Sequence, residues 1–425
     1  MRKILPIIIC IAIICMTFAS CSSDDVTIGN LTFRKDDPEI ILSGVNVKDV
    51  SAVKKFTSLR RITLAETAVS DLSPLAETDV EEVVISTAEA LDDLSDLKNV
   101  ETLKKLTINN CTKILDFSVI AECKNLQTLV IKDSGLYNID FLKEMSSLER
   151  LELKAKGVRD VAVLKELTFL KSLKLEGNRR FGEIEFLSDF TALEELKITG
   201  LEIRDISPVA SLVSLEKLDF SSNNIEDVSP LADLKEMKEL NLAANDIKDI
   251  SSLKAMKKLE KLYIEGCLVT DIDVVKNFKN LKELYISSNK ISSFSPIEKL
   301  TSLTSFFADN CGVDDITPLK GLDNLIHLQL SNNKIKDISP LNGKTKIIQL
   351  GLSYNIFEDA SVISQMKDII TLDLSYCKNI RDIHFASELK EMSNLNLDGT
   401  RLDDEEVEHL RSHLTDCNIS FIKEN

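Results

Sequence analysis

Apolar residues recur along this chain with a period of about 22 residues. In the segment 215–231 they occupy positions 1, 4, 6, 11, 14 and 17 of the repeat, and Asn223 occupies position 9. About seventeen copies begin at Asp37, Leu59, Val80, Leu103, Leu126, Leu148, Leu170, Leu193, Leu215, Met237, Leu259, Leu281, Leu303, Leu325, Ile347, Ile369 and Met392. A repeat of this length predicts a solenoid in which each turn packs on its neighbours, rather than the three domains that 425 residues would otherwise suggest.

Each repeat predicts one strand and one tight turn. Positions 4 and 6 are apolar and positions 3, 5 and 7 face outward, so stacked copies would form a long parallel sheet. A buried asparagine at position 9 would satisfy backbone groups of its own and the neighbouring turn. It is found at Asn178, Asn223, Asn245, Asn289, Asn333 and Asn355. The Asp-Ile-Ser-Pro sequences at 205–208 and 337–340 place a hydroxyl before a proline, which predicts short 3₁₀ or helical turns capped by that hydroxyl.

The repeat Leu-x-x-Leu-x-Leu-x-x-Asn-x-Ile-x-Asp-Ile-Ser-Pro-Leu resembles the internalin-type leucine-rich repeats of bacterial surface proteins. The resemblance implies an α/β leucine-rich-repeat solenoid shaped as a curved horseshoe. Its parallel β-sheet would line the concave face, and short 3₁₀ or helical turns and loops would form the convex face. It also implies partner binding on the concave face. The chain departs from the family pattern because we find no all-helical N-terminal cap, no Leu-Pro-x-Thr-Gly sorting signal and no immunoglobulin-like domain after the repeats.

The N-terminal residues have the pattern of a secretory signal. Arg2 and Lys3 precede an apolar run over 4–18 that is short for a membrane span. The sequence Phe-Ala-Ser-Cys that ends at Cys21 resembles a bacterial lipobox, which implies that Cys21 is lipidated and becomes the mature N-terminus. An ordinary cleaved signal and an uncleaved anchor helix are the alternatives.

These patterns predict four segments. Residues 1–20 are a lipoprotein signal peptide, and 21–36 hold the lipidated cysteine, a short tether and an N-terminal cap strand over 26–33. Residues 37–402 are the repeats. Residues 403–425 form a C-terminal cap with an amphipathic helix over 403–414 and a closing strand over 417–422.

The charge of the chain excludes some classes of partner. The formal net charge is −17, and removal of residues 1–20 leaves 50 basic and 69 acidic residues, or −19. Nucleic-acid binding and attraction to an anionic membrane surface both depend on Lys and Arg. We therefore expect no nucleic-acid partner, and membrane contact only through the N-terminal lipid.

Cysteine and histidine are the residues with the most potential for chemistry. Four cysteines occupy repeat position 9, where a thiol can replace asparagine as a buried donor: Cys111, Cys267, Cys311 and Cys377. Cys123 occupies an apolar slot and Cys417 has no assigned slot. His409 and His413 are four residues apart on the expected helix, so the pair suits either a zinc site or a charged helix C-terminus. His327 and His384 lie elsewhere in the sequence.

Motifs of enzyme sites are absent from the sequence. We find no Gly-rich phosphate loop, no Gly-x-Ser-x-Gly elbow and no Cys-x-x-Cys pair. The sequence therefore predicts a protein that is not an enzyme and needs no metal or cofactor.

The repeat register also shows which side chains would face a partner. Positions 2 and 3 of repeats 215–282 alternate in charge, which favours a soluble sheet face. Position 5 differs, because aromatic residues follow one another there in three successive repeats, and two tyrosines occupy position 8 of later repeats. With two polar neighbours, these residues form the candidate ligand-binding patch: Tyr263, Tyr285, Phe307, His327, Gln329, Tyr354 and Tyr376. The alternative is an aromatic ladder that only stabilises adjacent strands, beside isoleucines at position 2 (Ile326, Ile348 and Ile370) that turn inward.

Together these patterns predict a lipid-anchored binding protein of the bacterial cell envelope, exposed to the outside and monomeric. Its concave face would recognise or adhere to a host or bacterial surface protein. A glycan ligand is an alternative, although the chain has no tryptophan to stack on sugar rings. A structural envelope scaffold without a specific ligand is another.

Overall fold

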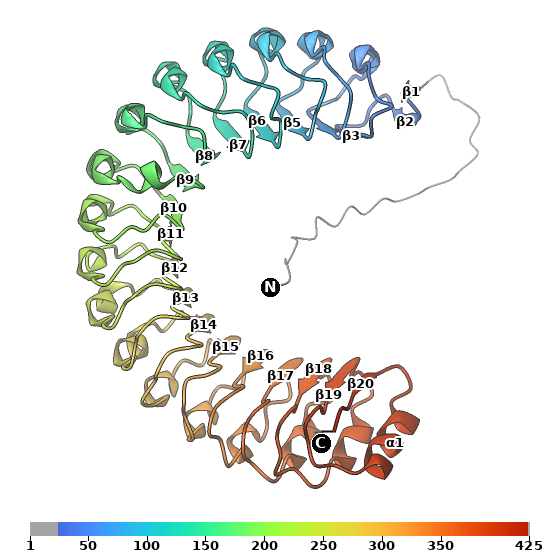
Figure 1. Cartoon of the computed structure of the whole chain (residues 1–425), viewed down its shortest axis with the longest axis vertical. Helices are drawn as coiled ribbons and strands as arrows, with labels where there is room; N and C mark the ends of the chain where they lie inside the picture. The colour runs from blue at the N-terminus through green and yellow to red at the C-terminus, as the bar shows by residue number, and fades with distance from the viewer. Residues whose placement is uncertain (1–23, 424–425) are drawn as a thin grey trace.

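Each repeat forms one turn of an open, curved solenoid in the computed structural model, which describes residues 24–423 (Figure 1). The strands are β1 (Asp25–Ile28), β2 (Leu31–Arg34), β3 (Glu39–Ser43), β4 (Arg61–Ala65), β5 (Glu82–Ser86), β6 (Lys105–Asn109), β7 (Thr128–Lys132), β8 (Arg150–Lys154), β9 (Ser172–Glu176), β10 (Glu195–Thr199), β11 (Lys217–Asp219), β12 (Glu239–Asn241), β13 (Lys261–Tyr263), β14 (Glu283–Tyr285), β15 (Ser305–Phe307), β16 (His327–Gln329), β17 (Gln349–Gly351), β18 (Thr371–Asp373), β19 (Asn394–Asn396) and β20 (Asn418–Ser420).

Short 3₁₀ turns, labelled η, alternate with these strands, and one α-helix, α1 (Asp404–His413), lies near the C-terminus. The 3₁₀ turns are η1 (Ser51–Lys55), η2 (Ser73–Glu77), η3 (Ser95–Asn99), η4 (Ser118–Glu122), η5 (Asp140–Glu144), η6 (Ala162–Glu166), η7 (Arg179–Gly182), η8 (Glu185–Asp189), η9 (Ser207–Ser211), η10 (Ser229–Leu231), η11 (Ser251–Ala255), η12 (Asp273–Asn277), η13 (Ser295–Ile297), η14 (Thr317–Leu319), η15 (Ser339–Leu341), η16 (Ser361–Gln365) and η17 (His384–Glu388).

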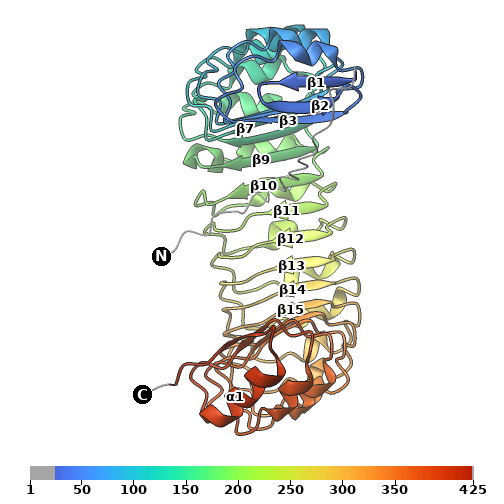
Figure 2. The ribbon, with the colours of Figure 1, turned by 90° about the vertical axis from the view of Figure 1, so that its right-hand side faces the viewer.

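Strands β3 to β20 form one parallel sheet in sequence order, and each pairs with the next without a shift in repeat register. For example, Lys261 lies beside Glu283 and Glu283 beside Ser305, all at position 3. The sheet lines the concave side and the 3₁₀ turns lie on the convex side (Figure 1), and Figure 2 shows the strands stacked along the long axis. The predicted leucine-rich-repeat solenoid is confirmed.

Position 9 connects neighbouring turns through buried hydrogen bonds. The Asn333 Nδ2 donates to the carbonyls of Ala308 and Leu330, both at 2.9 Å. Its Oδ1 accepts from the backbone N–H groups of Cys311 and Gly312 at 3.1 and 2.9 Å. One amide thus satisfies backbone groups of two consecutive turns, which confirms the predicted role for the five buried asparagines (Asn223, Asn245, Asn289, Asn333 and Asn355). Asn178 differs, because it is half-buried and its Oδ1 accepts from the N–H of Arg180 as the N-cap of η7.

Cysteine at position 9 keeps only the donor half of this role. The Sγ atoms of Cys267 and Cys311 lie 3.4 Å from the carbonyl oxygens of Leu242 and Ile286 in the preceding turns. Desolvation raises the pKa of the Cys311 thiol to about 11, which keeps the thiol protonated as a donor at neutral pH. The interpretation of these thiols as core residues is confirmed.

The strands shorten from the turn of Asn223 onward, where position 9 is asparagine in five turns, cysteine in three and threonine in one. Strands β3 to β10 have five residues, and β11 to β19 have three. The Phe220 carbonyl at position 6 accepts from the Nδ2 atoms of Asn223 and Asn245 at 3.0 Å each. The N–H of Ala243 at position 7 turns to the Asn241 side chain at 3.1 Å. Side chains thus take over the last bonds of the ladder, and the regular strand ends after position 5.

The caps of the 3₁₀ turns differ from our expectation. The Ser207 hydroxyl does not cap η9; instead, the Asp205 carboxylate accepts from the backbone N–H of Ser207 at 2.8 Å. The same bond recurs in η10, between Asp227 and the N–H of Ser229. The aspartate rather than the serine hydroxyl accepts this bond because the aspartate lies two residues before the first free N–H. At that spacing its short side chain closes a turn.

These capping bonds make the stability of the solenoid dependent on pH. The backbone and side chain of Ser207 hold the pKa of Asp205 below its usual range, and Ser251 does the same for Asp249. Because the folded pKa is lower than the unfolded pKa of about 3.9, the unfolded chain binds more protons in acid. The stabilisation is therefore complete above about pH 4 and is lost as the pH falls through the lower, folded pKa.

We expect the midpoint of urea unfolding to fall between pH 5 and pH 3. A variant with Asp205→Asn, Asp249→Asn and Asp315→Asn should retain the acceptor and show a shallower fall, because an amide does not titrate. Asn138 already performs this role naturally, accepting from the N–H of Asp140 at 2.6 Å. Equal acid sensitivity of the variant and the parent would contradict this explanation.

The two ends of the solenoid are covered differently. The expected single strand over 26–33 is wrong: β1 and β2 form an antiparallel hairpin outside the long sheet, because Gly29 at φ +61° reverses the chain. At the other end the expectation is confirmed. Helix α1 has Asp403 as N-cap in a capping box with Glu406, and β20 pairs with β19 as the closing strand.

In the C-terminal half of the solenoid, a lysine occupies a core position that is apolar in the adjacent turns. Lys344 is 1% exposed at repeat position 20, which Leu322 and Met366 occupy in the adjacent turns. Its Nζ donates to Asp323 Oδ1 and to the Lys320 carbonyl, both at 2.6 Å, and the ammonium lowers the pKa of Asp323. The stem of the lysine fills the slot, and its buried ammonium is paired with the carboxylate of Asp323, which is 76% exposed.

We expect Lys344→Met to leave the free energy of unfolding unchanged or to raise it, by up to about 3 kcal/mol, because an apolar residue in this slot removes the desolvation cost of the buried ammonium. Asp323→Ala should destabilise, since it leaves the ammonium without its charge partner. Urea titrations of the two variants test this. A Lys344→Met variant less stable than the Asp323→Ala variant would be the opposite of the expected order.

The predicted signal peptide over 1–20 and the lipidated Cys21 lie outside the described residues. Within residues 24–423, no helix is long and apolar enough to cross a membrane.

Candidate functional site

The middle and the C-terminal half of the concave face differ in charge. In the middle of the sheet, Lys238 Nζ lies 2.7 Å from Glu216 and Lys282 Nζ lies 2.8 Å from Glu260, at position 2 of consecutive turns. The predicted charge alternation therefore forms cross-strand ion pairs. Exposed pairs of this kind contribute about 0.2–1 kcal/mol each, so they suit a soluble scaffold surface.

The three aromatic residues at position 5 form a continuous stack across β13, β14 and β15. Ring centroids of Tyr263 and Tyr285 lie 4.6 Å apart, and those of Tyr285 and Phe307 lie 4.4 Å apart, with interplanar angles of 24° and 16°. All three side chains are half-buried. We call this group the aromatic ladder. The sequence placed its members on one face correctly.

The ladder is anchored to the charged region at one end. The Tyr263 hydroxyl donates to Glu283 Oε2 at 3.0 Å, and Lys261 binds the other carboxylate oxygen at 2.9 Å. Burial is the main cause that raises the pKa of Tyr263, and the hydrogen bond to Glu283 and the negative charge of Glu283 raise it further. The phenol is therefore a neutral donor, and the position of the first ring is held by a polar contact as well as by stacking.

Gln329 and His327 continue the face beyond the ladder. Gln329 follows Phe307 in the position-5 column, and its side chain lies over Gly351 in the next turn, where a Cβ atom would meet Gln329 Oε1 at 1.8 Å. His327 is half-buried at position 3, and its Nδ1 is buried without a hydrogen-bond partner. Both residues lie next to the ladder, as the sequence predicted.

Tyr354 and Tyr376 form a second, separate aromatic pair. Their ring centroids are 4.3 Å apart at an interplanar angle of 12°, and the Tyr376 ring covers Gly399. Both tyrosines have left-handed backbone conformations, with φ of +54° and +59°. Bulky residues occupy this region at a cost, so a tyrosine there has no local structural advantage over the glycine or asparagine found at position 8 of other turns.

The structure does not join the two aromatic groups into one patch. The ladder follows position 5 of β13–β15, whereas the pair lies at position 8, after β17 and β18. The turn of β16 separates them, with Gln329 at position 5 and Asn332 at position 8. A partner that contacts both groups must cover the sheet diagonally.

Two carboxylates beside the ladder were not recognised in the sequence. Glu265 and Asp309 stand at position 7 of the turns that carry Tyr263 and Phe307, and burial raises the pKa of both side chains. The Oε2 of Glu265 is buried and has no hydrogen-bond partner, while Asp309 accepts from the N–H of Ser331 at 2.6 Å. The sequence could have indicated these two carboxylates, because most other turns have small or uncharged residues at position 7.

The isoleucine column at position 2 does not turn inward. Ile326 and Ile348 are half-buried, and Ile370 is 45% exposed. Position 2 precedes the strand proper, so its side chain is not drawn into the core as those at positions 4 and 6 are. The column adds apolar surface to the same half of the concave face.

Comparisons with known proteins agree with this architecture. A model of leucine-rich repeats (two copies) matches residues 213–254, 235–277 and 279–321. A comparison with curated protein sequences finds no match.

Solved structures with the same fold cover most of the chain. A leucine-rich-repeat protein of Leptospira interrogans has a TM-score of 0.62 at 20% identity, covering 88% of this chain and 93% of that one. An internalin, InlF, of Listeria monocytogenes has a TM-score of 0.56 at 20% identity, covering 83% and 88%. The plant peptide hormone receptor RGFR1, in complex with RGF2, has a TM-score of 0.53 at 16% identity, covering 90% and 74%.

The chain thus contains leucine-rich repeats, and its fold is a leucine-rich-repeat solenoid structurally similar to an internalin. Solenoids of this type are commonly used for protein–protein recognition and are typically binding scaffolds without enzymatic activity.

Proposed function

We propose that this protein is a lipid-anchored recognition protein of the bacterial cell surface that binds another protein through the C-terminal half of its concave face, and that it is not an enzyme. The observation that carries the proposal is the aromatic ladder. Stacked, half-buried rings present a large and rigid contact area that loses little conformational entropy on binding. The preformed arc supports rigid docking of a partner.

Charge distribution favours a basic segment of the partner. At positions 3, 5 and 7 of the turns of β14 to β19, the outward residues include Glu283, Asp309, Asp373 and Asp398 but no lysine or arginine. Burial makes the carboxylates near the ladder costly to keep ionised, and a Lys or Arg side chain from the partner would offset this cost. A partner segment with both apolar and basic residues fits this half of the face.

A protein partner fits the ladder better than a glycan does. Sugar rings stack on the faces of aromatic rings, yet Tyr263 and Phe307 cover both faces of Tyr285. The ring edges are left for contact, which suits the side chains of a polypeptide. The plant receptor with the same fold was solved with RGF2 bound, which supports a polypeptide ligand here.

The experiment is a pull-down with residues 22–425 as bait against host-cell and bacterial lysates. The bait with Tyr263, Tyr285 and Phe307 replaced by alanine is the control for the ladder. A protein captured by the parent and lost in the variant would support the proposal. Capture of the same proteins by both, or of none, would favour a scaffold without a specific ligand, and elution by free sugars would favour a glycan.

The proposed anchor has its own test. Cys21→Ala should move the protein from the membrane fraction to the soluble fraction, because the acyl chains that would hold it there can no longer be attached. Protease treatment of intact cells should remove the parent protein. Unchanged fractionation of the variant would refute lipidation, and full protection from protease would refute exposure at the surface.

A further inference from the structure

Three of the four histidines of the chain gather at the C-terminal cap, where η17 meets α1. His384 begins η17, and His409 and His413 lie on α1. Ring centroids of His384 and His409 are 5.2 Å apart, and those of His409 and His413 are 4.2 Å apart. The residues come from two elements that are brought together only when the helix docks on the last 3₁₀ turn.

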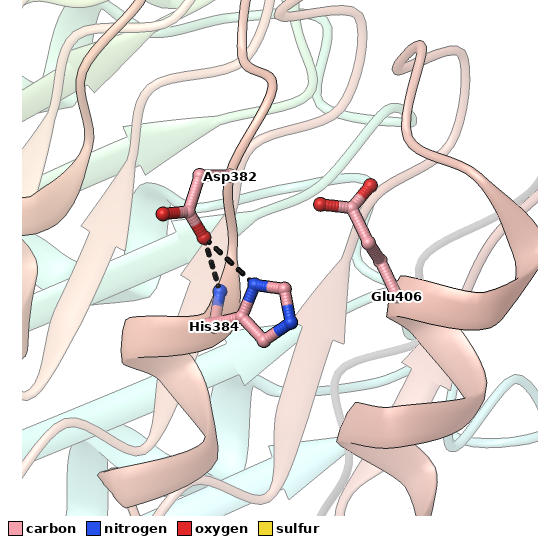
Figure 3. A group of neighbouring side chains, drawn as sticks. All are labelled: Asp382, His384 and Glu406. Atoms are coloured by element: carbon pink, nitrogen blue, oxygen red, sulfur yellow. Dashed lines mark hydrogen bonds and ion pairs between the residues drawn. The ribbon is translucent and has the colours of Figure 1, made fainter.

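His384 replaces the serine that begins many other 3₁₀ turns. Asp382 caps η17 as the other aspartates do, and its Oδ1 accepts from the backbone N–H of His384 at 2.9 Å. The same oxygen lies 2.9 Å from the ring Nδ1. Figure 3 shows this contact, with the second ring nitrogen turned away from Asp382. A proton on Nδ1 would leave the Nε2 lone pair free, an arrangement that prepares histidine as a metal ligand.

Glu406 supplies a carboxylate from the facing helix. One ligand atom each of Asp382, His384 and Glu406 lie within 4.8 Å of one another (Figure 3). Glu406 Oε2 accepts from the N–H of Asp403 at 3.2 Å in the capping box, which holds the side chain in place and leaves Oε1 available. His409 follows Glu406 by three residues, so both side chains project from the same face of α1.

We propose that His384 and Glu406, whose ligand atoms converge with one of Asp382 (Figure 3), bind one divalent transition-metal ion, with Zn²⁺ as the best match. Asp382 orients His384, and His409, whose ring lies 5.2 Å from that of His384, becomes the third protein ligand when the ion binds. Zinc–nitrogen bonds of about 2.0–2.1 Å place two imidazole centres about 5 Å apart around a tetrahedral ion, close to the spacing of His384 and His409. Imidazole and carboxylate donors suit zinc, copper and nickel better than magnesium. The carboxylates of Asp382 and Glu406 balance the charge of the ion.

His413 lies outside the proposed site. Its Nδ1 is 2.9 Å from the His409 carbonyl, and the Lys390 ammonium binds the His413 carbonyl at 3.0 Å. The positive charge at that end of α1 opposes a bound cation, so the ion would lie toward Glu406. His384 is exposed, which leaves a coordination position open to water.

A metal ion at this site would fasten the C-terminal cap to the repeats. The end of a solenoid is where unfolding starts most readily, because the terminal turn has a neighbour on one side only. An ion that binds the docked helix and not the detached one stabilises the cap by mass action. This role is independent of partner binding on the concave face.

The test uses the full chain, purified without a histidine tag and treated with a chelator. Isothermal titration with ZnCl₂ should show one saturable site per chain, and MgCl₂ should show none. His384→Ser, which restores the residue found in other turns and retains the Asp382 cap, should weaken zinc binding at least about 10-fold, and His409→Ala should do the same. His327→Ala, on the concave face, is the matched control and should bind as the parent does.

Thermal unfolding provides the second measurement. Zinc should raise the transition temperature of the parent and of His327→Ala, and should raise that of His384→Ser by less at the same zinc concentration. Absence of saturable zinc binding by the parent, or equal affinity of the parent and the His384→Ser variant, would overturn the proposal. Circular dichroism without zinc verifies that each variant is folded, as expected because none of the three substituted side chains belongs to the apolar core.

Discussion

Replacing Tyr263, Tyr285 and Phe307 together by alanine is expected to weaken binding of the partner protein at least 100-fold. Aromatic side chains at the centre of an interface often contribute about 2 kcal/mol or more each, and a loss of about 2.7 kcal/mol corresponds to a 100-fold change in Kd. Binding of the captured partner to the parent and the variant, measured by isothermal titration, gives this ratio.

The same substitution also removes two stacking contacts. Each aromatic pair contributes about 0.5–1.5 kcal/mol, so we expect a modest fall in the unfolding transition and a protein that stays folded. The core at positions 4 and 6 is untouched. Unfolding of the variant would show that the ladder is a structural element, and undiminished affinity would remove it from the binding surface.

A matched variant controls for changes to the sheet surface. Thr63, Val84 and Thr107 occupy position 5 of β4, β5 and β6, so they are the positional equivalents of the ladder in the N-terminal half. Their replacement by alanine should leave partner binding unchanged. Binding should also weaken at higher salt if the partner is basic, because the acidic half of the face attracts it electrostatically.

Asn333→Ala is expected to lower the free energy of unfolding by about 3–5 kcal/mol. The substitution leaves the N–H groups of Cys311 and Gly312 and the carbonyl of Ala308 without the amide that satisfies them, whereas the Leu330 carbonyl retains its bond from Asn355 Nδ2. Each buried polar group left without a partner costs about 1–3 kcal/mol, and water can reach only part of this site. Urea unfolding of the variant measures the loss.

The neighbouring residue provides the control. Asn332 is exposed and has φ of +55°, so Asn332→Gly retains a residue suited to this backbone conformation and removes an exposed side chain. We expect a change below about 1 kcal/mol. Equal effects of the two substitutions would show that the buried amide is not what holds consecutive turns together.

The sequence by itself determined the architecture of the repeats. Every repeat start from Asp37 to Met392 leads into a strand at positions 3 to 5 or 3 to 7, with no slip in register. A solenoid turn contacts chiefly its neighbours, so a local pattern repeated at constant spacing is sufficient to specify the stack. The same reasoning located the buried amides, the thiols at position 9 and the C-terminal helix.

Only the tertiary structure decided how side chains meet. Backbone direction and side-chain rotamers are not encoded in a hydrophobic pattern. They determine the N-terminal hairpin, the aspartate caps and the ion pair between Lys344 and Asp323. The separation of the aromatic ladder from the Tyr354–Tyr376 pair likewise depends on where positions 5 and 8 lie across the sheet.

The histidine cluster shows this limit most clearly. His409 stood out in the sequence for its spacing from His413, yet the structure brings it to His384, 25 residues earlier in the chain. That contact forms because α1 packs against η17 to cover the last turn of the core, which buries Val407 and Leu410 of the helix. Periodicity predicts which faces are buried, whereas the docking of a cap decides which exposed polar groups become neighbours.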